Sequence, residues 1–450
     1  MASAPWDRVP SENTLFVLVT GGNSGIGFGI CQRVIDEYLT TRSLSSHIVV
    51  IPTTRSAKKS RETISLLRQH VRKFATTSPS STLPRRVQVD LCNLPSIRRA
   101  ANQLISGTLS TPSDLPNEDN AFETLVDVRI PRLDSVIFNA GIGGCATTWP
   151  EFKGALAGHV IDPITGKKGV GSGDVPQMGE VFCANVFGHY VFAHRLAPLL
   201  SRPAANDTSE NAAILPPGRI IWETSIEPDG SHFSPSDIQA TKTKAAYEST
   251  KRLTDLLALT STLPGSRPYV ESYLTPDSTK SSEKPAQLPK IYLVHPGVVQ
   301  TTLFPLNAFM YFWYMVVLYL TRWLGSPWHP ITAYKGACAP AWLALQQQEW
   351  LDSAGAERIK WGSSTDFWGE CRVKKTEVDG WGWEGKVEDI KALRQEERWK
   401  GRKPGAKDAT EESLAEFKAL GAECWKRMEE LRKEWEERVD EYLAKQGEKA

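Results

Sequence analysis

The sequence predicts an α/β fold, a doubly wound parallel sheet with a helical, Trp-rich C-terminal extension, and three observations predict it. β-branched apolar runs alternate with helical segments from residue 15 to residue 295. The predicted strands end at polar or glycine residues, as strands do when their carboxyl ends line a ligand site. Beyond about residue 300 the composition changes, and 12 of the 15 tryptophans lie from Trp313 onward.

The predicted elements and regions follow one another along the 450 residues. Strands are expected at 15–20, 47–51, 86–89, 134–138, 219–222 and 291–295, and helices at about 25–39, 179–200, 243–261 and 409–444. Four stretches rich in Ser, Pro, Thr and Asn are expected as surface inserts, at 76–83, 111–120, 201–217 and 264–289. We expect three regions: a domain of alternating strands and helices with loop inserts (14–302), an apolar contact segment with a closing helix (303–345) and a charged, Trp-rich helical extension (346–450).

The composition argues against several classes of protein. Lys and Arg number 53 and Asp and Glu number 52, a balance that offers no electrostatic case for nucleic acid. The seven cysteines include no C-x-x-C pair, so we expect neither a disulfide framework nor a metal site. The first 13 residues are polar and have no apolar signal core. A folded protein in a reducing compartment is the simplest interpretation.

A glycine-rich turn at residues 20–27 joins the first predicted strand to the first predicted helix. Its glycines permit unusual backbone conformations, and the helix N-terminus presents free N–H groups to an anion. This position predicts a site for the pyrophosphate of a dinucleotide. The second strand ends in Thr54-Arg55 without an acidic residue, which favours the 2′-phosphate of NADP(H). The alternative is that Arg55 only caps a solvated loop.

Tyr247 and Lys251 lie four residues apart on a predicted helix and therefore on one face of it. Reduction of a carbonyl group requires a hydride on carbon and a proton on oxygen. A tyrosine has an ordinary pKa near 10, which makes it a poor acid–base group at neutral pH. A neighbouring ammonium group favours the phenolate and lowers that pKa. The pair is therefore a candidate proton-transfer site.

Taken together, these residues resemble the short-chain dehydrogenase/reductase family, which implies a Rossmann-type fold over roughly residues 14–302. The matching pieces come in the family's order: Thr20-Gly21-x-x-x-Gly25-x-Gly27, Asp90-Leu91, Asn139-Ala140-Gly141, Asn185, Ser225, Tyr247-x-x-x-Lys251 and Pro296-Gly297. By this resemblance Tyr247 donates the proton, Lys251 tunes it and binds the nicotinamide ribose, Ser225 bonds the substrate carbonyl and Asn185 holds the relay geometry. Asp90 would contact adenine, Asn139 would line the cofactor cleft, and Pro296 with Gly297 would lie beside the nicotinamide.

The full set of cofactor contacts expected from the resemblance is Thr20, Gly21, Asn23, Ser24, Gly25, Ile26, Gly27, Thr54, Arg55, Asp90, Leu91, Asn139, Ala140, Gly141, Tyr247, Lys251, Pro296, Gly297, Val299 and Thr301.

Two of these assignments have alternatives. Asp90 could instead be a helix N-cap or a loop acid. Ser225 lies 22 residues before Tyr247, whereas the family's serine usually precedes its tyrosine by about a dozen, so Ser231 and Ser234 compete with it. Ser225 is preferred because it lies just beyond the end of the fifth strand. Asn185 sits in an apolar helix, where a buried amide needs a hydrogen-bond partner.

A narrower resemblance is to the fungal reductases that act on the 3-ketone left after C-4 demethylation of a sterol. It rests on the inserts, the apolar segment after Pro296-Gly297, and the stretches 361–364 and 378–382. It implies NADPH, a sterol substrate, the other C-4 demethylation enzymes as partners, and a place at the endoplasmic reticulum or the lipid droplet. Reduction of another hydrophobic carbonyl, or an NADPH-binding scaffold without turnover, are the rival functions.

Two apolar features suggest contacts outside the core. The unbroken apolar run 308–320 covers roughly 20 Å as a helix, short of a hydrocarbon core of about 30 Å. Tyr311, Trp313, Tyr314 and Tyr319, with Trp323 just after the run, fit a membrane surface, and a substrate lid or a homodimer helix is the alternative. The charged helix 409–444 carries an apolar stripe from Leu414 to Trp435. That stripe predicts docking on the protein's own body, with partner binding as the alternative.

Overall fold

The computed structural model describes residues 4–42, 45–73, 82–84, 87–109, 127–143, 158–169, 176–202, 215–226, 228, 230–275, 287–300 and 308–447. Thr301, together with parts of all four predicted inserts, lies outside these residues.

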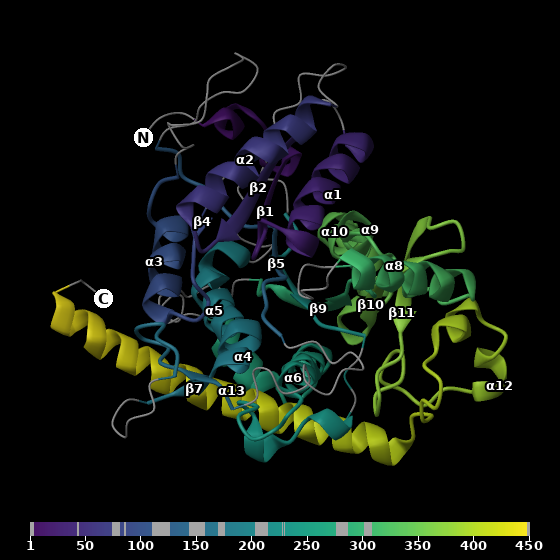
Figure 1. Cartoon of the computed structure of the whole chain (residues 1–450). Coiled ribbons are helices and arrows are strands. Elements are labelled where there is room, and N and C mark those ends of the chain that lie inside the picture. Colours follow the sequence, from purple (N-terminus) through teal and green to yellow (C-terminus); the bar gives the residue numbers. More distant parts are fainter. Residues whose placement is uncertain are drawn as a thin grey trace.

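A nine-stranded sheet forms the centre of the molecule (Figure 1), in the order β11-β10-β9-β8-β5-β1-β2-β3, with β4 also paired to β2. Every pairing is parallel except that of β11 with β10. The strands are β1 Thr14–Val19, β2 His47–Thr54, β3 Thr82–Pro84, β4 Val87–Gln88, β5 Ser135–Phe138, β8 Arg219–Glu223, β9 Lys290–His295, β10 Lys360–Thr365 and β11 Cys371–Thr376. A separate pair consists of β6 Val160–Ile161 and β7 Met178–Gly179. The predicted doubly wound parallel sheet is confirmed.

Helices cover both faces of the sheet, and strand residues alternate between the two cores. In β1, Phe16 and Leu18 join one buried cluster while Val17 and Val19 join the other. The first cluster lies under α3 Leu94–Ile105, α5 Gly188–Leu200, α6 Ala246–Thr260, α7 Arg267–Leu274 and α13 Glu411–Gln446. The second lies under α1 Gly25–Thr41, α2 Ala57–Arg72, α10 Cys338–Leu345 and α11 Gln348–Ser353.

Shorter elements complete the described chain. α4 Glu180–Phe182 and a π-helical turn, Cys183–Phe187, lead into α5, and α9 Ala333–Gly336 packs on α1. α8 Ala308–Trp323 and α12 Ile390–Leu393 lie in the C-terminal region. Short 3₁₀ turns are formed by Pro5–Arg8, Ser11–Asn13, Gly230–His232, Pro235–Asp237, Ala356–Arg358 and Glu397–Gly401.

The sheet extends beyond residue 302, the expected end of the cofactor-binding domain. β10 pairs in parallel with β9, and β11 pairs with β10. The sequence of β10, Lys-Trp-Gly-Ser-Ser-Thr, shows no apolar alternation, so periodicity could not identify it. Its polar side chains are buried because they have partners: the Ser363 hydroxyl donates to Gly336 O (2.6 Å) and accepts from Ala339 N (2.9 Å).

The apolar stripe of α13 docks on the protein's own body, which confirms the first of the two expectations for it. Trp425 is buried, and its indole N–H donates to Leu257 O on α6 (2.9 Å). Tyr190 on α5 donates to Glu429 on α13 (2.8 Å). Figure 1 shows α13 running across one side of the molecule, past α6 and α5. The helix has 36 residues, about 54 Å of length, so one stripe covers much of that side.

α13 and α6 approach each other closely at Gly421, and this contact allows a test of the docking. A Cβ added there would lie 2.4 Å from Thr260 Oγ1, a contact that stiff, buried Thr260 cannot relieve. Gly421→Ala should therefore lower the free energy of unfolding by about 1–3 kcal/mol, although alanine normally favours a helix. Urea denaturation measures the change, with exposed Glu423→Ala as the control. A stabilised Gly421→Ala protein would contradict this packing.

Candidate active site

The glycine-rich turn lies between β1 and α1, as predicted, and its geometry suits an anion. Gly21 and Gly25 have positive φ angles of 64° and 53°. A Cβ at Gly27 would lie 2.3 Å from Gly21 O, so the turn closes only with glycine there. A Cβ at Gly25 would meet no atom within 4 Å, so the turn opens outward at this point. Ser24 is the N-cap of α1, and the first N–H groups of that helix follow it.

The Thr20 hydroxyl fastens the carboxyl ends of β1 and β5 together. Its oxygen accepts from Asn139 N and Ala140 N, each at 3.0 Å, and lies 3.0 Å from His189 Nε2. The Asn139 amide donates to Thr20 O (2.9 Å). Burial lowers the pKa of His189 to about 3, so its ring is neutral at pH 7. Asn139 and Ala140 thus lie beside the glycine-rich turn, where the cofactor contacts are expected.

Asn185 connects the segment after β5 to α6. Its Oδ1 accepts from Ile142 N (2.7 Å), and its Nδ2 donates to Ile142 O (2.7 Å) and to Thr250 Oγ1 (3.3 Å). The side chain emerges from the π-helical turn, which interrupts the continuous helix expected over 179–200. Such turns recur where a helix must aim one residue at a site. The partner that the buried amide required is therefore present.

Tyr247 and Lys251 lie on one face of α6, as their spacing predicted. Tyr247 is half-buried, and its ring packs so closely on Gly143 that a Cβ there would lie 2.3 Å from Tyr247 Cδ2. Lys251 Nζ lies 5.6 Å from the centroid of the Tyr247 ring and donates to Glu223 O (2.7 Å). Burial lowers the pKa of Lys251 to about 8, against the opposing effects of Glu223 and Asp255. The ammonium group is therefore close enough to act on the phenol.

Ser225 lies two residues beyond β8, next to α6. The hydroxyl of its neighbour Thr224 donates to Lys251 O (3.1 Å), which fastens this strand end to the helix that carries Tyr247. Of the competing serines, Ser231 is exposed in a 3₁₀ turn, and the Ser234 hydroxyl bonds to that of Ser236 (2.9 Å). The position of Ser225 fits the expected role, which stays a prediction.

The remaining residues expected to contact the cofactor differ in how exposed they are and in whether their side chains already have hydrogen-bond partners. Arg55 is exposed, whereas the Thr54 hydroxyl is committed to Ser56 O (2.9 Å) and Ser60 Oγ (2.5 Å) at the start of α2. Asp90 accepts from Cys92 N (3.0 Å), and Asn93 is the N-cap of α3, so the N-cap alternative for Asp90 is wrong. Leu91 is buried against the start of α5, where a Cβ at Gly188 would lie 2.2 Å from Leu91 O.

The segment after β9 is held by residues 328–331. Gly297 has a positive φ of 71°, and its N–H donates to His295 Nδ1 (3.1 Å). Val298 N donates to Trp328 O (2.7 Å), and Val299 forms a bridge with Ile331. Pro296, Gly297 and Val299 thus lie at the carboxyl edge of the sheet, where the nicotinamide contacts are expected. Thr301 falls outside the described residues.

Several residues of the site escaped sequence reasoning. His189 follows Asn185 by one helical turn and touches Thr20, so its spacing was the signal that could have found it. Thr250 was visible only as part of the Tyr247–Lys251 interval. No sequence pattern indicated Glu223 or the buried ion pair of Lys360 with Asp255 (2.8 Å), because β8, α6 and β10 meet only in the folded chain.

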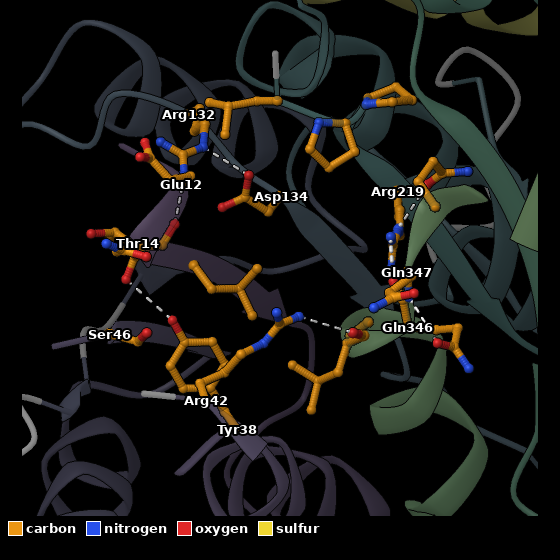
Figure 2. Close-up of a pocket in the computed structure, with 18 of the residues that line it drawn as sticks. Glu12, Thr14, Tyr38, Arg42, Ser46, Arg132, Asp134, Arg219, Gln346 and Gln347 are labelled. Atoms are coloured by element: carbon orange, nitrogen blue, oxygen red, sulfur yellow. Dashed lines mark hydrogen bonds and ion pairs between the residues drawn. The ribbon is translucent and has the colours of Figure 1, made fainter. Parts of the chain in front are cut away.

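Two pockets bracket this site. The larger, about 450 Å³, opens at the amino-terminal edge of the strands, where Thr14, Asp134 and Arg219 begin or precede β1, β5 and β8 (Figure 2). Its arginines are structural: Arg219 donates to Leu343 O and Gln346 O (2.7 Å each) at the end of α10. Ligands of such sheets bind at the opposite, carboxyl edge. A pocket of about 340 Å³ lies there. It is lined by Ile226, Pro228, Ser231, Trp328, Thr376, Glu377, Asp379, Gly401, Lys403, Pro404, Gly405, Ala406 and Lys407.

The observed sheet order, the glycine-rich turn before α1, and Asn185 with Tyr247-x-x-x-Lys251 at the carboxyl edge define a short-chain dehydrogenase/reductase. The chain is 44% identical to a 3-keto-steroid reductase of Gibberella zeae, covering 97% of each chain. It is 39% identical to one of Aspergillus fumigatus (96% and 97% covered) and 28% identical to one of Saccharomyces cerevisiae (82% and 90%). The chain belongs to the 3-keto-steroid reductase family.

Other comparisons add less. No family model matches the chain. A 3-oxoacyl-[acyl-carrier protein] reductase from Brucella melitensis, solved in complex with NAD, is 14% identical with a TM-score of 0.37, covering 73% of this chain and 89% of that one. A short-chain type dehydrogenase/reductase from Mycobacterium ulcerans is 16% identical with a TM-score of 0.38 (74% and 84%). These scores are too low to carry a conclusion. Within the described residues, no cluster of His, Cys, Asp or Glu is arranged to hold a metal ion.

Proposed function

We propose that the protein reduces the 3-ketone of a C-4-demethylated sterol to the 3β-alcohol, with NADPH as the hydride donor. One observation carries the proposal: Tyr247 lies beside the Lys251 ammonium at the carboxyl edge of the sheet, in a chain of the 3-keto-steroid reductase family. The glycine-rich turn, open at Gly25, supplies the anion site that a dinucleotide requires.

The side chains divide the work of the reaction. NADPH, when bound, supplies the hydride that forms the new C–H bond at the ketone carbon. The Tyr247 hydroxyl donates a proton to the ketone oxygen as negative charge develops there, and the nearby Lys251 ammonium stabilises the resulting phenolate. Ser225 holds the ketone oxygen by a hydrogen bond. Asn185 keeps residue 142 and α6 at a fixed separation through its bonds to Ile142 and Thr250.

NADPH is favoured over NADH by the charge at the end of β2. Arg55 is exposed there, and no acidic residue follows Thr54 to bind a free ribose 2′-hydroxyl. A guanidinium group forms strong, directional bonds with phosphate. The Thr54 hydroxyl is already hydrogen-bonded at the start of α2, so we do not expect it to bind the 2′-phosphate.

The same proposal includes a membrane surface as the source of the sterol. In α8 only Leu318 and Arg322 are buried, and Arg322 fixes the helix through His329 O and Pro330 O (2.9 Å each). Large apolar side chains are exposed on the rest of the helix: Phe309, Tyr311, Phe312, Trp313, Val317, Tyr319, Leu320 and Trp323, with Leu324 after it. Of the described helices, none has the length and apolar character needed to cross a bilayer.

A second element extends this surface. Phe367 and Trp368, in the turn between β10 and β11, are 50% and 82% exposed, and the Phe367 ring lies 6.4 Å from that of Trp323. No acidic residue occurs in α8, and Trp and Tyr suit the interfacial region of a bilayer. We call α8 with Phe367 and Trp368 the aromatic surface. In the chain, α8 follows the segment that begins at Gly297. A bilayer in contact with the aromatic surface would therefore deliver the sterol near the site. A location at the endoplasmic reticulum or the lipid droplet, association with other C-4 demethylation enzymes, and homodimer formation stay predictions.

Tyr247→Phe tests the reaction itself. Oxidation of NADPH by purified protein with a detergent-solubilised 3-keto sterol should fall about a hundredfold or more, because the proton donor is lost. NADPH binding, followed by fluorescence, should persist. Wild-type protein that binds NADPH without turnover would favour the scaffold, and turnover restricted to other ketones would favour the broader reductase.

Arg55→Ala tests the choice of cofactor. The dissociation constant for NADPH should rise about tenfold, since a charge-assisted bond to the 2′-phosphate is removed. The constant for NADH should stay the same. Exposed Lys426→Ala, on α13, controls for the loss of one positive charge. Equal effects on both cofactors would place Arg55 outside the 2′-phosphate site.

Flotation with phosphatidylcholine vesicles tests the aromatic surface. The double variant Phe312→Gln/Trp313→Gln and the single variant Trp368→Gln should each weaken vesicle binding, the double variant by about tenfold or more. Leu66→Gln changes an apolar residue of α2 that is 49% exposed, close to the 52% of Trp313, and should have no effect. Unchanged flotation would refute the membrane contact, and a dimer that dissociates in these variants would identify the surface as a subunit interface.

A further inference from the structure

Four charged side chains from three elements lie buried together behind Tyr247. Lys251 and Asp255 are one turn apart on α6, Glu223 is the last residue of β8, and Lys360 is the first residue of β10. Their exposed fractions are 6%, 0%, 5% and 2%. Buried charges are costly unless each has a partner. Only Lys251 has a role in the proposed reaction, so the presence of the other three requires a physical explanation.

Asp255 and Lys360 neutralise one another. Lys360 Nζ lies 2.8 Å from Asp255 Oδ2 in an ion pair that is closed to solvent. Asp255 raises the pKa of Lys251 while Lys360 lowers it, so the effects of the pair on Lys251 oppose each other. Asp255 is therefore not available as the counter-charge of Lys251.

The Glu223 carboxyl group is the remaining acidic group. Among the described residues, neither of its buried oxygens has a hydrogen-bond partner. Its own main-chain oxygen accepts the bond from Lys251 Nζ (2.7 Å), which places the ammonium at the end of β8. Burial raises the pKa of Glu223, and the charge of Lys251 acts in the opposite direction. An unpartnered buried carboxyl group beside a buried ammonium group points to a functional pairing.

The other titratable groups around the cluster leave this pairing intact. His189 on α5 and His295 on β9 have pKa values lowered by burial, so both are neutral at pH 7. Arg252 and Lys403 act on Lys360 rather than on Glu223. Tyr247 is the group that Lys251 serves on the other side. Asp255 and Lys360 form one ion pair, which leaves Glu223 and Lys251 as the remaining acid and base of the cluster.

We propose that Glu223 is the counter-charge of Lys251, a positioning residue that keeps the ammonium group protonated and in place beside Tyr247. The inference rests on the proposed function only in that Lys251 serves the proton transfer. Because Glu223 touches neither of the reacting groups, it acts through Lys251. The expected signature is a shift in pH dependence rather than a uniform loss of activity.

The sign of the shift follows from the charges. A carboxylate at residue 223 raises the pKa of Lys251 against the effect of burial. Without it, the pKa of Lys251 falls below its present value of about 8, and the ammonium group loses its proton at lower pH. Activity that needs the ammonium group should therefore decline earlier as the pH rises.

The experiment compares wild type, Glu223→Gln and Glu223→Asp from about pH 6 to about pH 9.5. One readout is kcat/KM for sterol reduction, and the other is NADPH affinity by fluorescence, which needs no turnover. In Glu223→Gln the alkaline midpoint of both profiles should move down by about one pH unit, a tenfold loss above both midpoints. Glu223→Asp keeps the charge and should stay near wild type.

A matched control removes a carboxylate together with its lysine. Asp255→Asn/Lys360→Met deletes the neutral ion pair and should move the midpoint less than Glu223→Gln, because the two effects of the pair on Lys251 oppose each other. An unshifted midpoint in Glu223→Gln, an equal loss at every pH in both Glu223 variants, or an equal shift in the control would each overturn the proposal. If the sterol is not reduced at all, the proposed function fails, and the NADPH binding profiles still decide the role of Glu223.

Discussion

The proposed proton transfer requires the Lys251 ammonium group to remain charged although it is buried, and the groups around it meet that requirement. Burial alone lowers the pKa of Lys251 toward neutrality, and a neutral amine would no longer favour the phenolate of Tyr247. The main-chain oxygen of Glu223 receives the ammonium group, and Thr224 fastens the same strand end to the backbone of α6. The end of β8 thus sets both the position and the electrostatic environment of the lysine.

The rest of the site depends on bringing strand ends together at one edge of the sheet. Thr20 bonds the end of β1 to the residues after β5, and Asn185 bonds those residues to α6. A neutral His189 stands behind Thr20, which keeps a further positive charge away from Lys251 at neutral pH. The glycine-rich turn and Tyr247 are therefore held in one frame, although more than 200 residues separate them in the chain.

The C-terminal region belongs to this frame as much as the first 300 residues do. β10 extends the sheet beside β9 and brings Lys360 to Asp255 on α6, the helix that carries Tyr247. α13 covers α6 through Trp425 and Gly421, so the helix that carries Tyr247 is packed on its outer side as well. Residues of the C-terminal region, among them Thr376, Asp379 and Lys403, line the pocket beyond Ser225 together with Ile226 and Pro228. Parts that carry no recognisable motif thus shape the environment of the motif residues.

The sequence by itself determined the parallel sheet, the glycine-rich turn between β1 and α1, the Tyr247–Lys251 pair and the docking stripe of α13. Each of these has a local signal: apolar runs with defined ends, glycines at a strand–helix junction, or side chains at helical spacing. Only the tertiary structure decided that Lys-Trp-Gly-Ser-Ser-Thr at 360–365 is a strand, that a π-helical turn aims Asn185, and that the main-chain oxygen of Glu223 receives the Lys251 ammonium group. Polar residues like these can be buried because residues distant in the chain provide their hydrogen-bond partners or an opposite charge. No pattern within a single segment of the sequence indicates such a partner.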